Sequence, residues 1–406
     1  MTASTQTGRK FRIGVIVNEF FCDEYPPLGG FGLSAKTFAE FFNSQPQYNI
    51  EVIALLPPYQ GWGPVPSELH GTKVVEVPKG LRKTRARLRE ENIDLLISVD
   101  YYPNYFERLV ALPRVPWIHW ARDPHSPENW DQILTLIGSG YPCEYNEKAK
   151  FRHEYYPQLQ ILRRILNRNF CCAVQETWLA ERAEAGFPLV GKNFFRLVNR
   201  IGVPPAPAAK TGRPVILFIG RLLPVKRPWV YFEIAKRLPD YEFLVVGEMD
   251  KRRHLEPIVE EAKSIPNLSL LGKRTGSDLH EALDRAWLLV NTSIHEGMPQ
   301  SILETLAFSV PVVSSLDYAG TIDIFGVSVG LTKGNGLKEV DSFVRTISEL
   351  VDDEDRRVSL GAAGRKFVEQ NYSNKAFLEQ FLAIMDDFDL ETAAIRSTLG
   401  AEQAGV

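Results

Sequence analysis

Short runs of Val, Ile and Leu alternate with longer helical patterns along most of this chain. Runs that are apolar at every position, instead of at alternate positions, are typical of parallel strands covered by helices on both faces. In the first half, strands are predicted over residues 11–17, 50–56, 72–77, 94–99, 116–120 and 170–174, with helices such as 31–43 and 81–92 between them. The alternation therefore predicts an α/β fold built on a parallel sheet.

A proline-bearing stretch interrupts this pattern once and divides the chain. Residues 202–214 show no periodicity and contain several prolines, which cannot join the middle of a sheet. The pattern then restarts, with strands predicted over 215–219, 242–246, 268–271, 288–292 and 310–313. Because 406 residues suit two cores better than one, we predict two Rossmann-like, doubly wound domains over 1–201 and 215–373. Residues 202–214 are the predicted linker, and residues 374–406 a helix that packs on the first domain and a flexible tail.

Composition narrows the functions that this chain can have. A net charge of −3 argues against nucleic acid as a partner. The first ten residues are polar and no run of about 18 apolar residues occurs, which predicts a cytoplasmic protein without signal peptide or membrane span. The four cysteines lack a Cys-x-x-Cys spacing, which indicates reduced thiols.

The most informative segment is 291–307, in which a predicted strand ends, a loop with Gly297 follows and Pro299 suits the first turn of a helix. Unpaired N–H groups at a helix N-terminus, with the positive end of the helix dipole, favour an anion such as a diphosphate. Glu296 lies in the loop and Glu304 about one turn into the helix. The helix dipole alone also favours an acid near its start, so Glu304 has an equally good structural explanation.

A second segment follows the strand 215–219. Arg221 and Lys226 come after Gly220, at the edge of the sheet where open α/β folds bind ligands. An arginine fork and a lysine point charge suit a phosphate group. A surface turn is the alternative explanation for the two cations.

Together the two segments resemble the retaining GT-B glycosyltransferases of family 4, which include sucrose-phosphate synthases and bacterial mannosyl- and glucosyltransferases. Gly220-Arg221 with Lys226 stands where that family keeps its diphosphate-binding Arg and Lys, and Glu296 to Glu304 reproduces its Glu-x7-Glu spacing. The glycine loop Gly29-Gly30-Phe31-Gly32 extends the resemblance to the first domain.

The resemblance implies a GT-B fold, in which two domains face a cleft, and a hexosyltransferase that retains the anomeric configuration. The donor would be a nucleoside-diphosphate sugar, the acceptor a sugar, glycolipid or polysaccharide, and no cofactor is expected. The donor sugar would contact Glu296, Gly297 and Met298. The diphosphate would contact Gly30, Arg221, Lys226, Met298, Pro299 and Gln300. The ribose and base would contact Glu304, Gly247, Lys273 and Arg274.

The same resemblance predicts catalysis without a metal. Arg221 and Lys226 would stabilise the negative charge that develops on the leaving diphosphate, which is the task a metal performs elsewhere. Asp-x-Asp occurs only at 353–355 and 387–389, in polar helical surroundings that we interpret as solvated faces.

The segment 116–125 departs from the family's pattern. The family commonly places a His at the end of this strand, where the present chain has Arg122, followed by Asp123. Besides Glu296, the expected catalytic residues are therefore Arg122, Asp123 and His119. Either Arg122 takes over a charge-stabilising role, or His119 or His125 reaches the cleft. A histidine inside a strand is more often a core residue whose hydrogen bonds are satisfied.

Two other functions stay open: a GT-B epimerase acting on a nucleotide sugar, and a catalytically silent subunit that binds a sugar nucleotide for a partner. Residues 82–89 form a basic helix, which would make a peripheral contact with the inner face of the membrane if the acceptor is lipid-linked. A solvated helix face explains the same charges.

Overall fold

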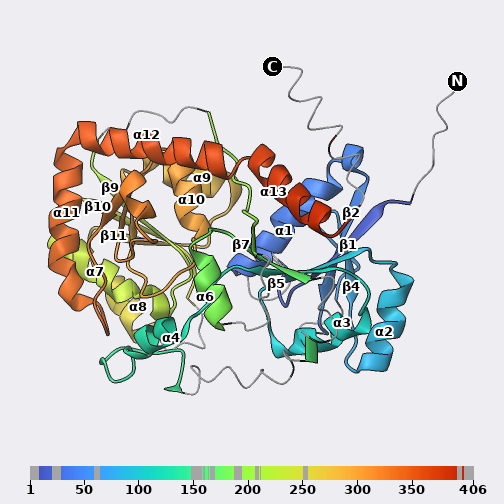
Figure 1. Ribbon diagram of the computed structural model, residues 1–406. Helices are drawn as coiled ribbons and strands as arrows, with labels where there is room; N and C mark the ends of the chain where they lie inside the picture. Colours follow the sequence, from blue (N-terminus) through green and yellow to red (C-terminus); the bar gives the residue numbers. More distant parts are fainter. Residues whose placement is uncertain are drawn as a thin grey trace, which may run out of the picture. The chain divides into compact units, whose positions relative to one another are not determined.

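The computed structural model describes residues 9–20, 29–58, 65–147, 158, 161–162, 164, 170–186, 194–205, 210, 212–249, 255–390 and 396. The chain divides into two compact units, which Figure 1 shows in sequence colours. The first unit comprises residues 1–124, 154–200 and 374–406, and the second comprises 125–153 and 201–373. Residues 206–209 and 211 of the predicted linker, and most of the predicted tail, lie outside the described residues.

The sheet of the first unit is parallel except at one edge. Its strand order among the described residues is β3-β4-β2-β1-β5-β6-β7-β8, and only β3 runs antiparallel to its neighbour. The strands are β1 (Phe11–Ile16), β2 (Ile50–Leu56), β3 (Glu68–Leu69), β4 (Thr72–Glu76), β5 (Leu95–Val99), β6 (Trp117–Ala121), β7 (Phe170–Val174) and β8 (Phe194–Arg196). Each strand predicted in this half is present within a residue or two; β3 and β8 were not predicted, because two or three residues carry no periodicity.

The helices of the first unit include the last helix of the chain. They are α1 (Gly30–Asn43), α2 (Leu81–Glu90), α3 (Phe106–Ala111), α6 (Leu179–Gly186) and α13 (Asn374–Asp387). The ring of Phe377 on α13 packs edge-on against Phe38 and Phe41 of α1, with centroids 5.8 and 5.3 Å apart. Burying such rings stabilises the unit, so α13 is part of the core of the first unit.

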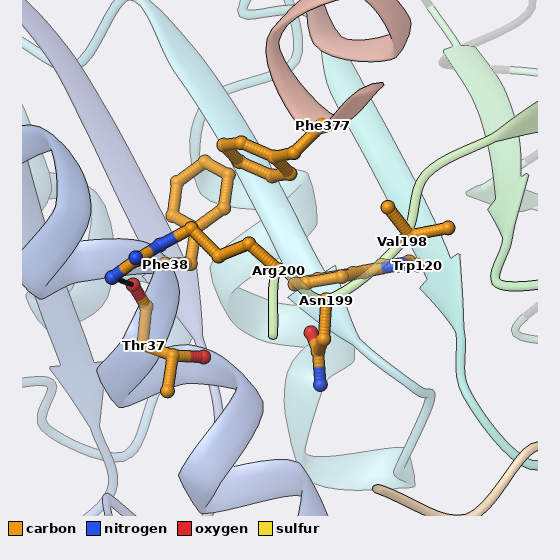
Figure 2. A pocket seen from close by; sticks show the side chains of 7 residues that line it. All are labelled: Thr37, Phe38, Trp120, Val198, Asn199, Arg200 and Phe377. Atoms are coloured by element: carbon orange, nitrogen blue, oxygen red, sulfur yellow. Dashed lines mark hydrogen bonds between the residues drawn. The ribbon is translucent and has the colours of Figure 1, made fainter. Parts of the chain in front are cut away.

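A small hollow of the first unit lies beside this aromatic cluster, as Figure 2 shows. The Trp120 indole N–H at its edge donates to the Leu197 carbonyl at 2.8 Å, and Asn199 donates to Ser34 Oγ at 2.9 Å. These hydrogen bonds join segments that are far apart in the sequence, so we interpret the hollow as a packing joint. It is lined by Thr37, Phe38, Trp120, Val198, Asn199, Arg200 and Phe377.

The second unit has its own parallel sheet, in the order β11-β10-β9-β12-β13-β14. Its strands are β9 (Val215–Ile219), β10 (Glu242–Val246), β11 (Leu268–Gly272), β12 (Leu288–Asn291), β13 (Val312–Ser314) and β14 (Gly326–Ser328). The first five match predicted strands, and the three-residue β14 was not predicted. The prediction of two parallel, doubly wound α/β domains is confirmed.

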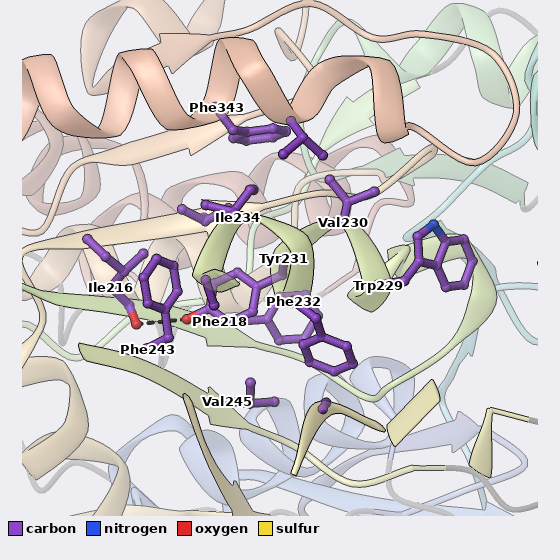
Figure 3. Packing of buried hydrophobic residues seen from close by; sticks show 14 of the residues in the cluster. Ile216, Phe218, Trp229, Val230, Tyr231, Phe232, Ile234, Phe243, Val245 and Phe343 are labelled. Atoms are coloured by element: carbon purple, nitrogen blue, oxygen red, sulfur yellow. Dashed lines mark hydrogen bonds between the residues drawn. The ribbon is translucent and has the colours of Figure 1, made fainter. Parts of the chain in front are cut away.

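The core of the second unit forms where α7 (Pro228–Arg237) lies against the sheet, as Figure 3 shows. The buried Tyr231 hydroxyl donates to the Ile216 carbonyl at 2.8 Å and lies 3.0 Å from the Leu244 carbonyl, so one side chain ties β9 to β10. The other helices are α4 (Pro127–Leu134), α8 (Glu256–Ala262), α9 (Gly276–Arg285), α10 (Gln300–Ala307), α11 (Val340–Asp352) and α12 (Glu354–Asn371).

The segment 125–153 corrects the predicted domain boundaries. It lies between β6 and β7 in sequence, which is why the first domain was predicted to contain it, yet it belongs to the second unit. Ile133 and Leu136 are fully buried in the second core, and Tyr141 stacks on Trp229 with ring centroids 4.5 Å apart. The chain therefore passes from one unit to the other after residues 124, 153, 200 and 373.

Among the described residues, no helix combines the length and the apolar character that crossing a membrane requires.

Candidate active site

Two loops meet at the carboxyl edge of the second sheet. One follows β9 and reaches Lys226 through a short 3-10 helix, Pro224–Lys226, and the other follows β12. Thr292 Oγ1 donates to the Lys226 carbonyl at 2.7 Å, and the Ile294 N–H donates to the Val225 carbonyl at 2.8 Å. Because backbone groups are held on both sides, the two loops have a fixed register.

This register brings Lys226 to Glu296. The Lys226 ammonium forms an ion pair with Glu296 Oε1, and Ser293 Oγ donates to the same oxygen at 2.7 Å. The two side chains are 20% and 10% exposed, so their attraction is screened less than that of a surface pair. The cation predicted for the diphosphate and the carboxylate predicted for the donor sugar are therefore neighbours.

The helix that follows this loop begins one residue later than predicted. Pro299 is extended and precedes α10, whose first residue is Gln300, whereas the sequence suggested Pro299 itself in the first turn. The Gln300 side-chain amide donates to Glu304 Oε1 at 2.8 Å, and burial raises the pKa of Glu304 to about 7. Met298 is buried beside this helix N-terminus.

The remaining predicted residues of the second unit lie along the same edge. Arg221 is exposed. A Cβ atom at Gly247 would lie 1.9 Å from the Gly220 carbonyl oxygen, so this glycine is required by the close approach of two strand ends. Lys273 and Arg274 follow β11, which is separated from β9 by β10, and Arg274 pairs with Asp278 at 3.4 Å.

In the first unit, the glycine loop holds a carboxylate against the start of α1. The Gly32 N–H donates to Glu19 Oε1 at 3.1 Å. A Cβ atom at Gly29 would lie 2.1 Å from the same oxygen, whereas one at Gly30 would meet no atom of the described residues within 4 Å. A side chain at Gly29 would therefore displace the Glu19 carboxylate, whereas one at Gly30, the predicted phosphate contact, would not.

The end of β6 gathers the other predicted residues. His119 is buried inside the strand, its Nδ1 lies 3.3 Å from Ser98 Oγ, and burial lowers its pKa to about 3, so the ring is neutral. Arg122 is buried with its guanidinium over the Trp120 ring, 4.8 Å from the centroid, and Asp123 is half-buried.

Sequence reasoning did not single out Asp100, which joins this group. It follows β5 directly, with a left-handed φ of 58°, and is buried. Burial and then the charge of Asp123 raise its pKa to about 7. The available signal was an acid placed immediately after the predicted strand 94–99, at the same edge as Arg122 and Asp123.

His125 belongs to the second unit. Its ring stacks on Trp130, with centroids 4.4 Å apart, and lies 4.2 Å from the ring of His295, the residue before Glu296. Within the second unit, His125 is therefore placed beside the Glu296 loop.

Residues 203–367 match the family model described as glycosyl transferases group 1. The chain is 23% identical over 298 residues to the O-antigen biosynthesis glycosyltransferase WbnH of Escherichia coli, covering 72% of this chain and 78% of that one. It is 27% identical over 183 residues to the 2-deoxystreptamine glucosyltransferase of Streptomyces kanamyceticus, covering 44% and 45%.

Solved structures share the fold. The sucrose-phosphate synthase of Thermosynechococcus elongatus superposes with a TM-score of 0.70 at 15% identity, covering 93% of this chain and 98% of that one. The Anabaena protein HepE, solved with UDP and glucose, gives 0.64 at 15% identity, covering 93% and 99%. Likeness at such identities shows the GT-B fold, and residues 203–367 are similar to the glycosyl transferases of group 1.

Proposed function

We propose that this protein is a retaining glycosyltransferase that moves a hexose from a nucleoside-diphosphate sugar to a sugar, glycolipid or polysaccharide acceptor, without a metal. The observation that carries the proposal is the pairing of Lys226 with Glu296 beside the N-terminus of α10. Retention of configuration rests on the family resemblance of these residues.

The chemistry of this pair fits glycosyl transfer. As the bond between the sugar and the diphosphate breaks, negative charge grows on the leaving phosphate, and a preorganised cation stabilises that charge selectively. Lys226 and Arg221 supply cations at this edge of the sheet, while Glu296 accepts hydrogen bonds from hydroxyls of the donor sugar. Glu304, half-buried one turn into α10, receives the ribose hydroxyls.

The comparisons suggest which substrates to try first. HepE was solved with UDP-glucose, and the Staphylococcus aureus protein TarM was solved with UDP. WbnH is described as an O-antigen biosynthesis enzyme. We propose a UDP-sugar as the donor and a glycan, carried on lipid or free, as the acceptor.

The test is release of nucleoside diphosphate from UDP-, GDP- and ADP-hexoses, with and without excess EDTA. Turnover of one donor that persists in EDTA and falls about 100-fold in Lys226→Ala is the expected result. Complete loss in EDTA that magnesium reverses would refute metal independence. Binding of the nucleotide without turnover would indicate a silent subunit, and a changed sugar without release of diphosphate would indicate an epimerase.

We further propose that α2 makes a peripheral contact with anionic lipid on the inner face of the membrane. Arg87 pairs with Glu90 and Glu91, and Arg85 donates to the Ala111 carbonyl at 3.3 Å. The exposed basic residues Arg82, Lys83 and Arg89 carry the proposed contact. Sedimentation with anionic vesicles, but not with neutral ones, that is lost when these three residues become alanine would support it; equal sedimentation of the variant would contradict it.

A further inference from the structure

Arg227, the residue after Lys226, is fully buried and forms a two-pronged ion pair with Glu339. Its Nη1 donates to Oε1 at 2.9 Å and its Nη2 to Oε2 at 2.7 Å, and both side chains are almost inaccessible to solvent. The sequence analysis assigned no role to Arg227.

The pair joins the carboxyl ends of adjacent strands. Arg227 lies in the loop after β9 and donates through Nε to the Thr292 carbonyl after β12 at 2.7 Å. It also donates to Ser315 Oγ after β13 at 2.9 Å. Glu339 accepts from the Thr332 N–H and hydroxyl, beyond β14, at 2.7 and 2.8 Å. One guanidinium and one carboxylate thus fix the loops after β9, β12, β13 and β14.

Stability alone does not account for this arrangement. Moving an arginine and a glutamate out of water is costly, and apolar residues of similar size are often as stabilising or more so. The backbone of Arg227 is also held in the left-handed region, with φ of 46°, which disfavours a residue with a side chain. Gly336 lies so close that a Cβ there would stand 2.3 Å from Nη1 of Arg227. These costs are accepted in a place that directly adjoins Lys226.

We propose that Arg227, held by Glu339, is a positioning residue that fixes Lys226 and the Thr292–Glu296 loop relative to the leaving diphosphate. The proposal rests on the proposed function of this edge as the donor site. Lys226 has a long, flexible side chain, so its ammonium is placed only as well as its backbone is placed. Two neighbours hold the Lys226 backbone: Arg227, through the peptide bond that joins the two residues, and Thr292, whose hydroxyl donates to the Lys226 carbonyl.

The experiment separates positioning from stability with a double variant. Arg227→Met leaves the Glu339 charge buried without its partner and is expected to lower the melting temperature. Adding Glu339→Gln removes that charge while keeping the shape, so the melting temperature of the double variant should recover. Turnover of the donor by the double variant should nevertheless stay about 10- to 100-fold below that of the unaltered protein, because a displaced catalytic group is costly.

Arg237→Met is the matched control, since it removes an arginine that pairs with Asp341 on the surface. It should change neither the melting temperature nor the turnover of the donor. Thr292→Val provides a second variant of nearly equal shape, in which the hydroxyl that contacts the Lys226 and Arg227 carbonyls, at 2.7 and 3.1 Å, is lost. It should weaken binding of UDP, measured by calorimetry, several-fold, while the melting temperature falls by no more than the loss of this buried hydroxyl accounts for.

Full turnover in the double variant, or unchanged UDP affinity and turnover in Thr292→Val, would overturn the positioning role. If the double variant does not fold, Thr292→Val decides the question. Failure of the proposed function is distinguishable, because the unaltered protein itself would then release no nucleoside diphosphate from any of the nucleotide sugars.

Discussion

Glu296 and Glu304 lie in one segment but in different electrostatic surroundings. Glu296 forms an ion pair with Lys226 and accepts a hydrogen bond from Ser293, whereas Glu304 accepts a hydrogen bond from the neutral amide of Gln300. A carboxylate beside the cation that binds the leaving group contributes mainly to the stability of the transition state. A carboxylate that binds the ribose stabilises the bound donor and the transition state equally. The two residues should therefore respond differently to substitution.

Glu296→Ala is expected to lower kcat about 100-fold with a small change in the KM for the donor. Glu304→Ala is expected to raise that KM about 10-fold and to leave kcat nearly unchanged, because uniform binding is lost. Steady-state kinetics with saturating acceptor measure both constants. Equal effects of the two substitutions on kcat and KM would contradict these roles.

The raised pKa of Glu304 predicts a dependence of stability on pH. Its ordinary value is 4.5 and the folded value is about 7, so the folded chain holds this proton more tightly than the unfolded chain. The protonated Glu304 therefore contributes to the unfolding free energy at low pH, and this contribution is lost as the pH rises from about 4.5 to about 7. Between pH 5 and 8, the unaltered protein should lose about 1–2 kcal/mol more unfolding free energy than Glu304→Gln, a figure reduced for partial exposure. Urea titrations at both pH values check this, and parallel losses would disprove it.

Among the elements, the buried strands could be predicted from the sequence, and the strands of two or three residues could not. The strands 50–56, 170–174, 215–219 and 242–246 have their predicted bounds, because a strand covered on both faces is apolar at nearly every position. The strands β3, β8 and β14 are two or three residues long, and tertiary contacts alone define them. The motif residues lie directly after the strands that the sequence predicted. The pairs Arg227–Glu339 and His125–His295 could not be predicted, because their members are distant in sequence and meet only in the folded chain.

Helix α4 carries a local signal of its own. Ser126 Oγ accepts from the Asn129 N–H at 3.3 Å, and Asn129 Oδ1 accepts from the Ser126 N–H at 3.0 Å, which forms a capping box. The capping box fixes the backbone of Ser126, the residue after His125, at the point where the chain passes into the second unit.

Ser126→Ala should lower the unfolding free energy by about 1 kcal/mol, the usual cost of a lost helix cap. Chemical denaturation followed by tryptophan fluorescence measures the loss, and Ser264→Ala, at an exposed position, is the control. A loss no greater than that of the control would mean that the cap is not formed in solution.

At the scale of the whole molecule, the second unit is assembled from two separate pieces of chain. The group 1 match covers 203–367, but α4 and the residues after it complete the core beneath α7. Trp130, Ile133 and Leu136 bury their side chains there. A truncation at the family boundary leaves that surface open to water.

Residues 201–373 alone should therefore be less stable than the same residues with segment 125–153 supplied, either fused through a flexible linker or added as a peptide. Loss of a few buried apolar side chains costs about 3–5 kcal/mol or more. Thermal unfolding and binding of a hydrophobic dye compare the two forms. Equal stability and equal dye binding would show that the segment is only peripheral to this core.

The repeated passage of the chain between the units also orders events on the ribosome. Segment 125–153 emerges before α7, whose Trp229 stacks on Tyr141, and at about 5–20 residues per second the interval is on the order of 4–15 s. During that time its apolar side chains cannot yet pack against α7. The first unit waits even longer, because α13, which supplies Phe377 and Phe381 to its core, is synthesised after every helix and strand of the second unit. The domain that leads the sequence is thus the last that can finish folding, and chaperones have a long interval in which to bind it.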